Sequence, residues 1–246
     1  MNKKTVLLGC LFVCHYAIGN DNVTSVVDSF LNCDNSFFHQ LKDNIEDISP
    51  YSDLTIKDDI AYIPVSDVSS TNDHEYRFKE PIKYRGLELA GYQNIYINTN
   101  LLGKYYYWGF TVNNSIKEIQ GRLPQLSWQP FNEMTAVANS RIYDSKNHDK
   151  GWQNNPYIFD GVVPRANTIE KSIYLEKIDD NHAMLLCSLQ GDIDKNTLYL
   201  IHPDMKYIDQ ELADKRESKI KALQEQQTEH AIPTQKQSDD VKISRD

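Results

Sequence analysis

The fold class of this chain is decided by one stretch, Tyr105-Tyr106-Tyr107-Trp108-Gly109-Phe110-Thr111-Val112. Aromatic and β-branched side chains pack well on the half-buried surface of a sheet, so we predict a strong strand here. Alternate residues of a strand point to opposite faces. We therefore expect the face that carries Trp108 to be core. The opposite face, with Tyr105 and Tyr107, is a candidate exposed platform for a sugar or a peptide.

Further strands and short helices flank this stretch, and their apolar runs end at prolines, glycines or polar turns. The predicted strands are 60–63, 76–79, 82–84, 87–92, 136–143, 172–178 and 182–189, and the predicted short helices are 116–123 and 195–201. Because Pro81 separates 76–79 from 82–84, these are either two short strands or one broken edge strand. The tracts 105–119 and 183–201 share a layout of strand, polar turn and short helix. They indicate a pair of ββα units, although such pieces are common in any α+β protein.

Helices are predicted near both ends of the mature chain. Apolar residues from Val26 to Leu41 recur at helical spacing over 22–42, and polar residues at 32–36 predict a break within that helix. From 206 onward the chain is highly charged and predicts a solvated helix, and beyond about Thr228 it offers no apolar face to bury. We therefore expect one α+β domain over 20–205, with a mostly antiparallel sheet, followed by a charged helix and a disordered tail over 206–246.

Residues 1–19 predict a cleavable secretory signal peptide. Lys3 and Lys4 precede an apolar run over 5–16, and Ala17 and Gly19 place small residues at a cleavage site after Gly19. The alternative is a lipoprotein signal in which Cys10 is acylated. The short basic segment favours bacterial export to the periplasm or the medium, while glycosylation sequons at 22–24 and 113–115 leave a eukaryotic secretory protein open.

Charge and cysteine content narrow the classes of partner. The formal net charge is −9, and removal of the signal with its two lysines makes it (26 − 2) − 35 = −11. An acidic chain is a poor nucleic-acid binder, because such binding depends on Lys and Arg. The sequence after the signal has no further apolar run of the length that a membrane span requires, so we expect no stable membrane insertion. The mature chain keeps Cys33 and Cys187, an even pair in an oxidising compartment, so we predict a disulfide between them. Cys187 alternates in phase with Leu185 and Leu189, and Cys33 is expected to share a helix face with Phe30 and Phe37.

Motifs for catalysis are absent from the sequence. No two of the mature histidines lie closer than twenty residues apart, and there is no zinc-type Cys spacing, nucleophile elbow or phosphate-binding glycine loop. We predict no metal and no cofactor. Carboxylates near aromatic residues, namely Glu133, Asp160 and Glu170, have no spacing that marks a glycosidase pair.

The remaining candidate site is a binding surface of aromatic residues with one carboxylate: Tyr105, Tyr107, Trp128, Trp152, Tyr157 and Asp160. Tyr and Trp often anchor interfaces, although loop aromatics also pin a loop onto its own domain. The sequence thus favours an exported, soluble, non-enzymatic module that binds a protein or a ligand, with an unknown protein or glycan partner. The alternatives are an envelope-polymer hydrolase and a carbohydrate-binding accessory protein.

Overall fold

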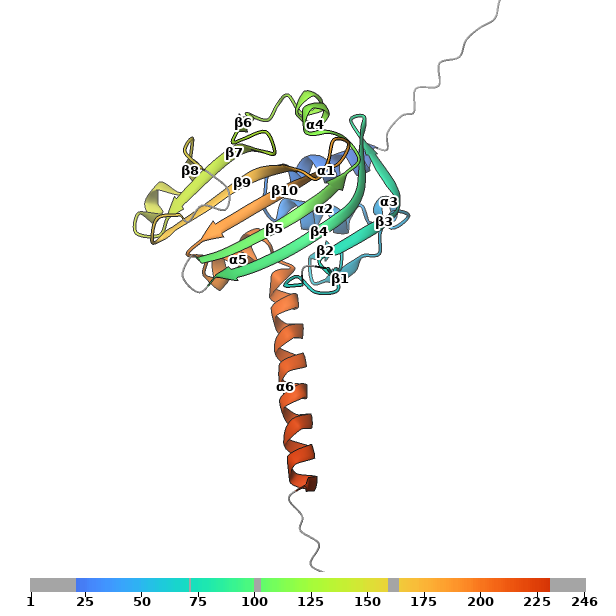
Figure 1. The fold of residues 1–246 in the computed structure, drawn as a ribbon, viewed down its shortest axis with the longest axis vertical. Coiled ribbons are helices and arrows are strands. Elements are labelled where there is room, and N and C mark those ends of the chain that lie inside the picture. The colour runs from blue at the N-terminus through green and yellow to red at the C-terminus, as the bar shows by residue number, and fades with distance from the viewer. Residues whose placement is uncertain (1–20, 71, 100–102, 159–163, 231–246) are drawn as a thin grey trace, which may run out of the picture.

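Figure 1 shows the protein as a computed structural model that describes residues 21–70, 72–99, 103–158 and 164–230. The predicted signal peptide over 1–19, the Cys10 alternative, Asp160 and the tail beyond 230 lie outside the described residues.

The described elements alternate in runs of helices and strands. The helices are α1 (Asp21–Phe30), α2 (Ser36–Asp43), α3 (Ile45–Ile48), α4 (Ile116–Arg122), α5 (Lys195–Ile201) and α6 (Met205–His230), with a 3₁₀ turn at His148–Lys150. The strands are β1 (Thr55–Lys57), β2 (Ile60–Tyr62), β3 (Glu75–Tyr84), β4 (Leu87–Thr99), β5 (Gly103–Val112), β6 (Gln129–Pro130), β7 (Thr135–Asp144), β8 (Gln153–Asn154), β9 (Thr168–Lys177) and β10 (Ala183–Gly191).

The molecule is built around an antiparallel sheet of eight strands. Its order is β3-β4-β5-β10-β9-β7-β6, and β8 also pairs with β7. The two strands with the most apolar sequences, β5 and β10, pair at the centre, and β1 with β2 forms a separate small sheet. The predicted α+β class with a mostly antiparallel sheet is confirmed.

The predicted pair of ββα units is also confirmed, and their spacing is constant. The units are β4-β5-α4 and β9-β10-α5. Trp108 lies opposite Cys187 in the central pair (187 − 108 = 79), and the residues that pair with them on the outer side, Asn94 and Ile173, are also 79 apart (173 − 94 = 79). An approximate two-fold axis through the centre of the sheet therefore relates the units.

The helix of each unit begins at an N-cap in the same register. Ser115 caps α4 and accepts a hydrogen bond from the Glu118 N–H, whereas Asp194 caps α5 and accepts one from the Thr197 N–H. These caps satisfy N–H groups that have no partner inside the helix. They are 79 residues apart as well (194 − 115 = 79), and a proline soon follows each helix.

Helices cover one face of the sheet and build the core there. Figure 1 places α1, α2 and α5 behind the central strands. Phe30 of α1 contacts Phe110 of β5 edge to face, with ring centroids 4.8 Å apart, and Trp108 is fully buried. The predicted core face of β5 is confirmed.

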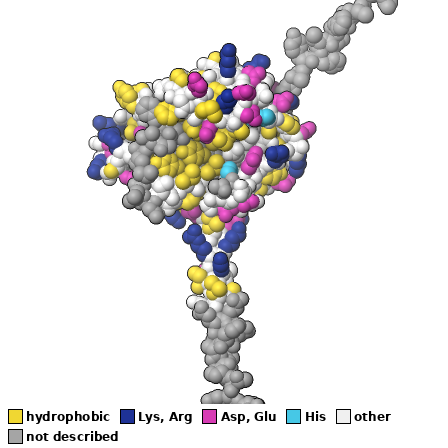
Figure 2. Space-filling view, viewed as in Figure 1, with side chains coloured by type: hydrophobic (Ala, Val, Ile, Leu, Met, Phe, Trp, Pro, Cys, Tyr) yellow, Lys and Arg dark blue, Asp and Glu magenta, His cyan; other side chains and the backbone are white. Residues whose placement is uncertain are grey.

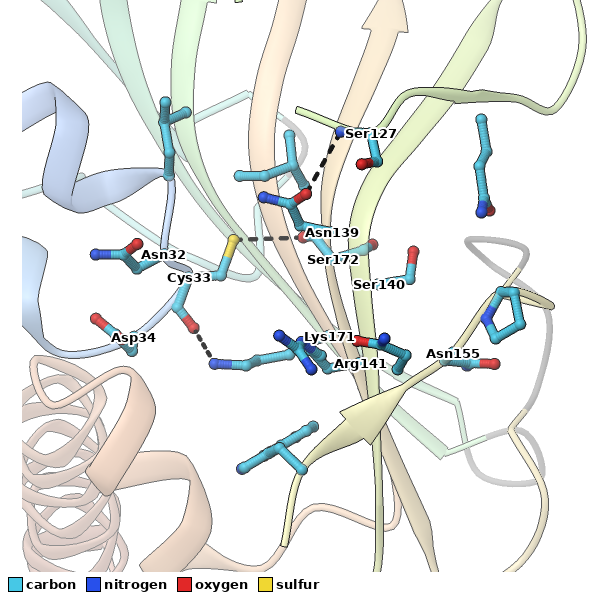
Figure 3. A pocket seen from close by; sticks show the side chains of 16 residues that line it. Asn32, Cys33, Asp34, Ser127, Asn139, Ser140, Arg141, Asn155, Lys171 and Ser172 are labelled. Atoms are coloured by element: carbon cyan, nitrogen blue, oxygen red, sulfur yellow. Dashed lines mark hydrogen bonds between the residues drawn. The ribbon is translucent and has the colours of Figure 1, made fainter. Parts of the chain in front are cut away.

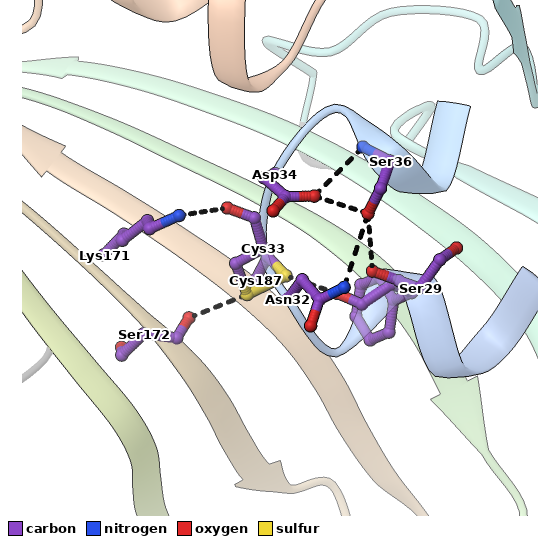
Figure 4. The surroundings of a disulfide bond; sticks show 9 residues. Ser29, Asn32, Cys33, Asp34, Ser36, Lys171, Ser172 and Cys187 are labelled. Carbon is purple, nitrogen blue, oxygen red and sulfur yellow. Dashed lines mark hydrogen bonds between the residues drawn. A yellow bond between two sulfur atoms is a disulfide. The ribbon is translucent and has the colours of Figure 1, made fainter. Parts of the chain in front are cut away.

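The predicted helix over 22–42 breaks, as expected, between α1 and α2. Cys33 itself lies in this break with a left-handed backbone (φ 49°), so the expectation that it sits on a helix face is wrong. The turn nevertheless buries the side chain of Cys33 beside Phe30. The disulfide to Cys187 is present, with Cα atoms 5.4 Å apart, and it joins the α1–α2 turn to the centre of the sheet (Figure 4).

The opposite face carries a smaller hydrophobic cluster and not an exposed tyrosine platform. Tyr105 and Tyr107 are 5% and 9% exposed, and they form the cluster with Leu186, packed against Ile95, Tyr174 and Met184. Figure 2 shows a hydrophobic area at the centre of this face. Large neighbours on adjacent strands cover the rings, which is why alternation alone predicts too much exposure.

Several strands differ in extent from their predictions, and β9 begins four residues before its predicted start at 172. The tracts on either side of Pro81 form one edge strand, β3, whose register shifts between Arg77 and Ile82. Of the two predicted alternatives, this is the single broken edge strand. By contrast, β4 continues seven residues past the predicted end at 92, to Thr99. Its second half contains Gln93 and Asn94, which a sequence pattern assigns to a turn, but both are buried and hydrogen-bonded.

Asn94 leads to a buried polar group at the junction of α5 and α6. Its amide donates to Asp204 at 3.0 Å, and Asp204 Oδ1 lies 3.1 Å from His202 Nε2, although the ring N–H does not point at that oxygen. Both Asp204 and His202 are fully buried, and Trp108 stacks on the imidazole at 4.3 Å. This group holds the start of α6 against the sheet, and α6 then projects from the domain (Figure 1).

None of the helices within the described ranges combines the length and apolar character that a membrane span requires.

Candidate binding cleft

A polar cleft of about 770 Å³ opens where the α1–α2 turn faces strand β7 (Figure 3). The turn forms one wall, and the segments around β6 and β8 form the rim. The lining residues are Leu31, Asn32, Cys33, Asp34, Ser127, Gln129, Asn139, Ser140, Arg141, Trp152, Asn154, Asn155, Pro156, Lys171, Ser172 and Ile173.

The cleft exists because β7 lacks a continuous outer neighbour. On its outer side, β6 pairs with Val137 and Ala136, and β8 pairs with Arg141 and Ile142. Between them the register of β7 against β9 shifts, and Asn139 adopts a left-handed backbone (φ 53°). Such a bulge leaves residues unpaired and re-aims side chains, so it turns this edge into the floor of the cleft.

Two cations stand opposite each other in the cleft. Arg141 of β7 and Lys171 of β9 are direct register partners, so their side chains leave the same face of the sheet. Burial lowers the pKa of Lys171, the nearby Asp34 partly offsets this, and Arg141 lowers the pKa further. Like charges directly opposite on neighbouring strands are destabilising.

Lys171 is held in place by neutral neighbours. Its Nζ donates to the Cys33 carbonyl at 3.0 Å and lies 5.1 Å from the centre of the Trp152 ring. Asp34, the acid of the cleft, accepts hydrogen bonds from both the backbone and the hydroxyl of Ser36 (Figure 4). Arg141 forms no hydrogen bond or ion pair with any residue that the structure describes.

One hydroxyl of the lining residues, Oγ of Ser140, is buried without a described partner, whereas the equally unpaired Oγ of Ser172 leaves the sheet on the opposite face, in register with Ser188 and Tyr107. Buried polar groups almost always have a hydrogen-bond partner, so unpaired ones beside a cleft indicate a place where water or a ligand completes the bonding. A third residue, Asn155, is already paired, because its amide donates to Glu170.

The predicted aromatic surface is not assembled as one site. Trp152 lines the cleft, but Tyr143 and Lys171 lie against its ring. Trp128 packs on the core and donates from Nε1 to the Leu123 carbonyl, although its neighbours 127 and 129 line the cleft. Tyr157 is 83% exposed.

The other members are elsewhere. Tyr105 and Tyr107 belong to the cluster on the opposite face, and Asp160 lies outside the described residues. Of the carboxylates considered for glycoside cleavage, Glu133 is exposed and Glu170 is paired with Asn155 and Gln190.

Arg141 and Lys171 were missed from the sequence. Each falls in or beside a predicted strand, where a charged residue is read as the solvent-facing half of an alternating pattern. The sequence does carry a signal, because in each strand the cation stands among positions that are otherwise apolar or neutral. Interpreting the two cations as one site requires the strand register that places Arg141 opposite Lys171.

Within the described part of the chain, no three His, Cys, Asp or Glu side chains gather closely enough to hold a metal ion. No protein-family model, curated protein or solved structure matches this chain. The functional argument therefore depends on the geometry of the cleft.

Proposed function

We propose that this protein is an exported, non-enzymatic binding module and that the polar cleft between the α1–α2 turn and β7 is its ligand site. The observation that carries the proposal is a cleft of about 770 Å³ bordered by polar groups without a described partner, the buried hydroxyl of Ser140 and the guanidinium of Arg141. Pockets of this volume are typical of ligand sites.

The chemistry of the cleft favours binding over catalysis. Among its described lining residues the ionisable side chains are Asp34, Arg141 and Lys171. Two hydrogen bonds from Ser36 hold one oxygen of the Asp34 carboxylate in the α1–α2 turn, and general acid–base catalysis needs a group within hydrogen-bond reach of the proton it moves. Lys171 is the one potential nucleophile of the three, and no described hydrogen bond or ion pair joins its ammonium to Asp34 as a base.

Export is proposed from the predicted signal over 1–19 together with the disulfide. The Cys33–Cys187 bond joins segments 154 residues apart, and such bonds persist in oxidising compartments such as the periplasm or the extracellular space. The expected mature terminus is Asn20, which the intact mass of exported protein would test.

The test of the binding site is a capture experiment with matched variants. Asn32 and Asn154 lie on opposite walls of the cleft and are exposed, so Asn32→Trp and Asn154→Trp should fill it without disturbing the core. The control is Asn196→Trp, which makes the same change on exposed α5. A partner or ligand retained stoichiometrically by the control but lost from both cleft variants supports the proposal, and equal retention by all three rejects it.

A carbohydrate-binding accessory role is the second candidate, favoured by the indole of Trp152 beside several amides. Sugars stack on open aromatic faces, whereas Lys171 and Tyr143 lie against this ring. Titration with neutral glycans should therefore leave the tryptophan fluorescence unchanged, and a saturable change lost in the Asn154→Trp variant would favour the second candidate.

A further inference from the structure

We infer that the cleft binds an acidic residue within an extended peptide segment of a protein partner, with Arg141 and Lys171 holding its carboxylate. The inference rests on the proposed function, because it names the occupant of the same cleft.

The first argument is charge. The chain as a whole carries a formal net charge of −9, yet the described lining residues carry two cations and one acid (Arg141, Lys171 and Asp34). Ser36 donates two hydrogen bonds to one oxygen of this acid, and no described ion pair joins Asp34 to either cation, so the cations outnumber the acid two to one in the cleft. A positive spot on an acidic protein attracts a negative ligand and orients it on approach.

The second argument is the unfavourable pairing of the cations. Arg141 and Lys171 face each other directly across β7 and β9, and Lys171 is already partly desolvated. A carboxylate placed between them would replace repulsion by two charge-assisted hydrogen bonds. Binding would also raise the pKa of Lys171, because a nearby anion favours the charged ammonium.

The third argument is that the structure holds one of the two cationic side chains in place and leaves the other without a described partner. Lys171 is fixed by the Cys33 carbonyl and the Trp152 ring, and one hydrogen bond leaves two of its ammonium hydrogens for a ligand. Arg141 is exposed and has no described partner, so its planar guanidinium can turn to meet a carboxylate with two N–H groups. One cation is thus fixed and the other is adjustable.

An extended peptide fits the rest of the cleft better than a sugar does. The outer edge of β7 has no strand partner over 138–140, between the segments paired with β6 and β8, although the Ser140 carbonyl there already accepts from the Asn155 N–H at 2.9 Å. The backbone groups that remain in this gap can bond a short stretch of an extended chain. The amides of Gln129 and Asn154 lie on either side of the gap and that of Asn32 on the facing wall, and each offers a donor and an acceptor that match a peptide backbone. The aromatic ring of the cleft is already in contact with Lys171 and Tyr143, which leaves less of it for a sugar.

The test uses hexapeptide arrays probed with the intact mature protein. One array has Glu at a central position with the other positions varied, and its twin has Gln there. We expect binders on the Glu array and a drop in affinity of about tenfold or more for the matching Gln peptides, as the loss of a charge-assisted contact predicts.

Variants then assign the contact. Arg141→Gln should weaken the selected peptides about tenfold, Arg141→Lys should weaken them less, and Arg77→Gln should have no effect. Arg77 is the matched control, since it is an exposed arginine on β3 at the opposite edge of the sheet. Thermal melts of all three confirm that each variant is folded.

Three binding results would overturn the inference, and so would the absence of binding. They are peptides that bind equally with Gln, peptides unaffected by Arg141→Gln, and a lack of peptide binders while a galacturonic acid trisaccharide binds in an Arg141-dependent manner. A lack of any binder also overturns it, whereas the proposed binding function fails only if the Trp variants retain the captured partner.

Discussion

The two ββα units have one topology and one spacing, yet they carry different chemistry at equivalent positions. Trp108 in the first unit corresponds to Cys187 in the second, and the C-cap that follows the helix is Leu123 in one and His202 in the other (202 − 123 = 79). The first unit is stabilised by apolar packing. The second adds a covalent bond and a buried polar group.

The same comparison explains where the cleft lies. Lys171 in β9 corresponds to Tyr92 in β4 (171 − 92 = 79), and both side chains leave the helix-covered face of the sheet. Tyr92 is fully buried against Phe37 of α2, with ring centroids 6.1 Å apart. At Lys171 the α1–α2 turn and the Trp152 ring approach instead, so one strand position is core in the first unit and cleft wall in the second.

The largest effect is expected from removing the covalent bond of the second unit. For Cys33 and Cys187, 154 residues apart, the chain-entropy estimate gives about 5 kcal/mol. Reduction, or a Cys33→Ser/Cys187→Ser double variant, should therefore lower Tm by roughly 10–20 °C. Thermal melts with and without a dithiol measure this, and the double variant serves as its own control because a reductant should not lower its Tm further. A fall of less than about 2 °C in both cases contradicts the prediction.

A second prediction exchanges one residue between the units. His202→Leu places the first unit's residue in the second and leaves Asp204 buried beside Asn94 alone. Removing one member of a buried polar group costs about 1–3 kcal/mol, because the remaining acceptor stays desolvated. Urea unfolding should show this loss.

Asp204→Asn in the His202→Leu background should recover part of that stability, since an amide is cheaper to bury than a carboxylate. A double-mutant cycle measures the coupling between the two positions. Strictly additive effects would mean that His202 and Asp204 do not interact.

A third prediction concerns close packing in the first unit. A Cβ on Gly109 would lie 2.4 Å from the Leu185 carbonyl oxygen and 2.7 Å from the Phe30 ring, so Gly109→Ala should destabilise the protein by about 2 kcal/mol. Gly121→Ala is the matched control, because a Cβ there meets nothing within 4 Å and alanine favours helix α4. It should stabilise the protein by about 0.5–1 kcal/mol. Equal effects in denaturant unfolding would contradict the packing argument.

The smallest expected effect concerns Asp194, the N-cap of α5 in the second unit. The Thr197 backbone N–H and hydroxyl lower the pKa of Asp194 below its ordinary value of 3.8. This stability is present above about pH 4 and is lost as the pH falls through the lowered pKa. Asp194→Ala should cost about 1 kcal/mol at pH 7, and the difference from the native protein should shrink near pH 2.

Asp194→Asn is the comparison variant, since its amide oxygen still caps α5 but does not titrate in this range. Unfolding free energies measured at pH 7 and near pH 2 decide the question. A loss in Asp194→Ala that is the same at both values would show that the charge of the cap contributes nothing.

Much of the fold was predictable because local signals agreed with it. The strand at β5, the hairpin of β9 and β10, the cap at Ser115 and the pairing of Cys33 with Cys187 all follow from patterns within a few residues or from cysteine number. The second half of β4 was not predictable, because Gln93 and Asn94 look like turn residues until their partners in β5 and at Asp204 are known.

The cleft was harder to predict than the fold. It depends on where β6 and β8 stop, on a bulge at Asn139 and on the register that places Arg141 opposite Lys171. None of these has a sequence signal of its own. Trp152 was the predicted site residue that the structure places in the cleft, and it lies there as a support for Lys171.

The position of the disulfide also determines when it can form during synthesis of the chain. Cys187 follows Cys33 by 154 residues, and a ribosome adds about 5–20 residues per second, so Cys33 is made roughly 8–30 s before its partner. During that interval the segment that becomes a wall of the cleft carries a reactive thiol. The disulfide can fix the cleft wall formed by Cys33 and Asp34 only after β10 has been synthesised, which makes the cleft one of the last parts of the molecule to be completed.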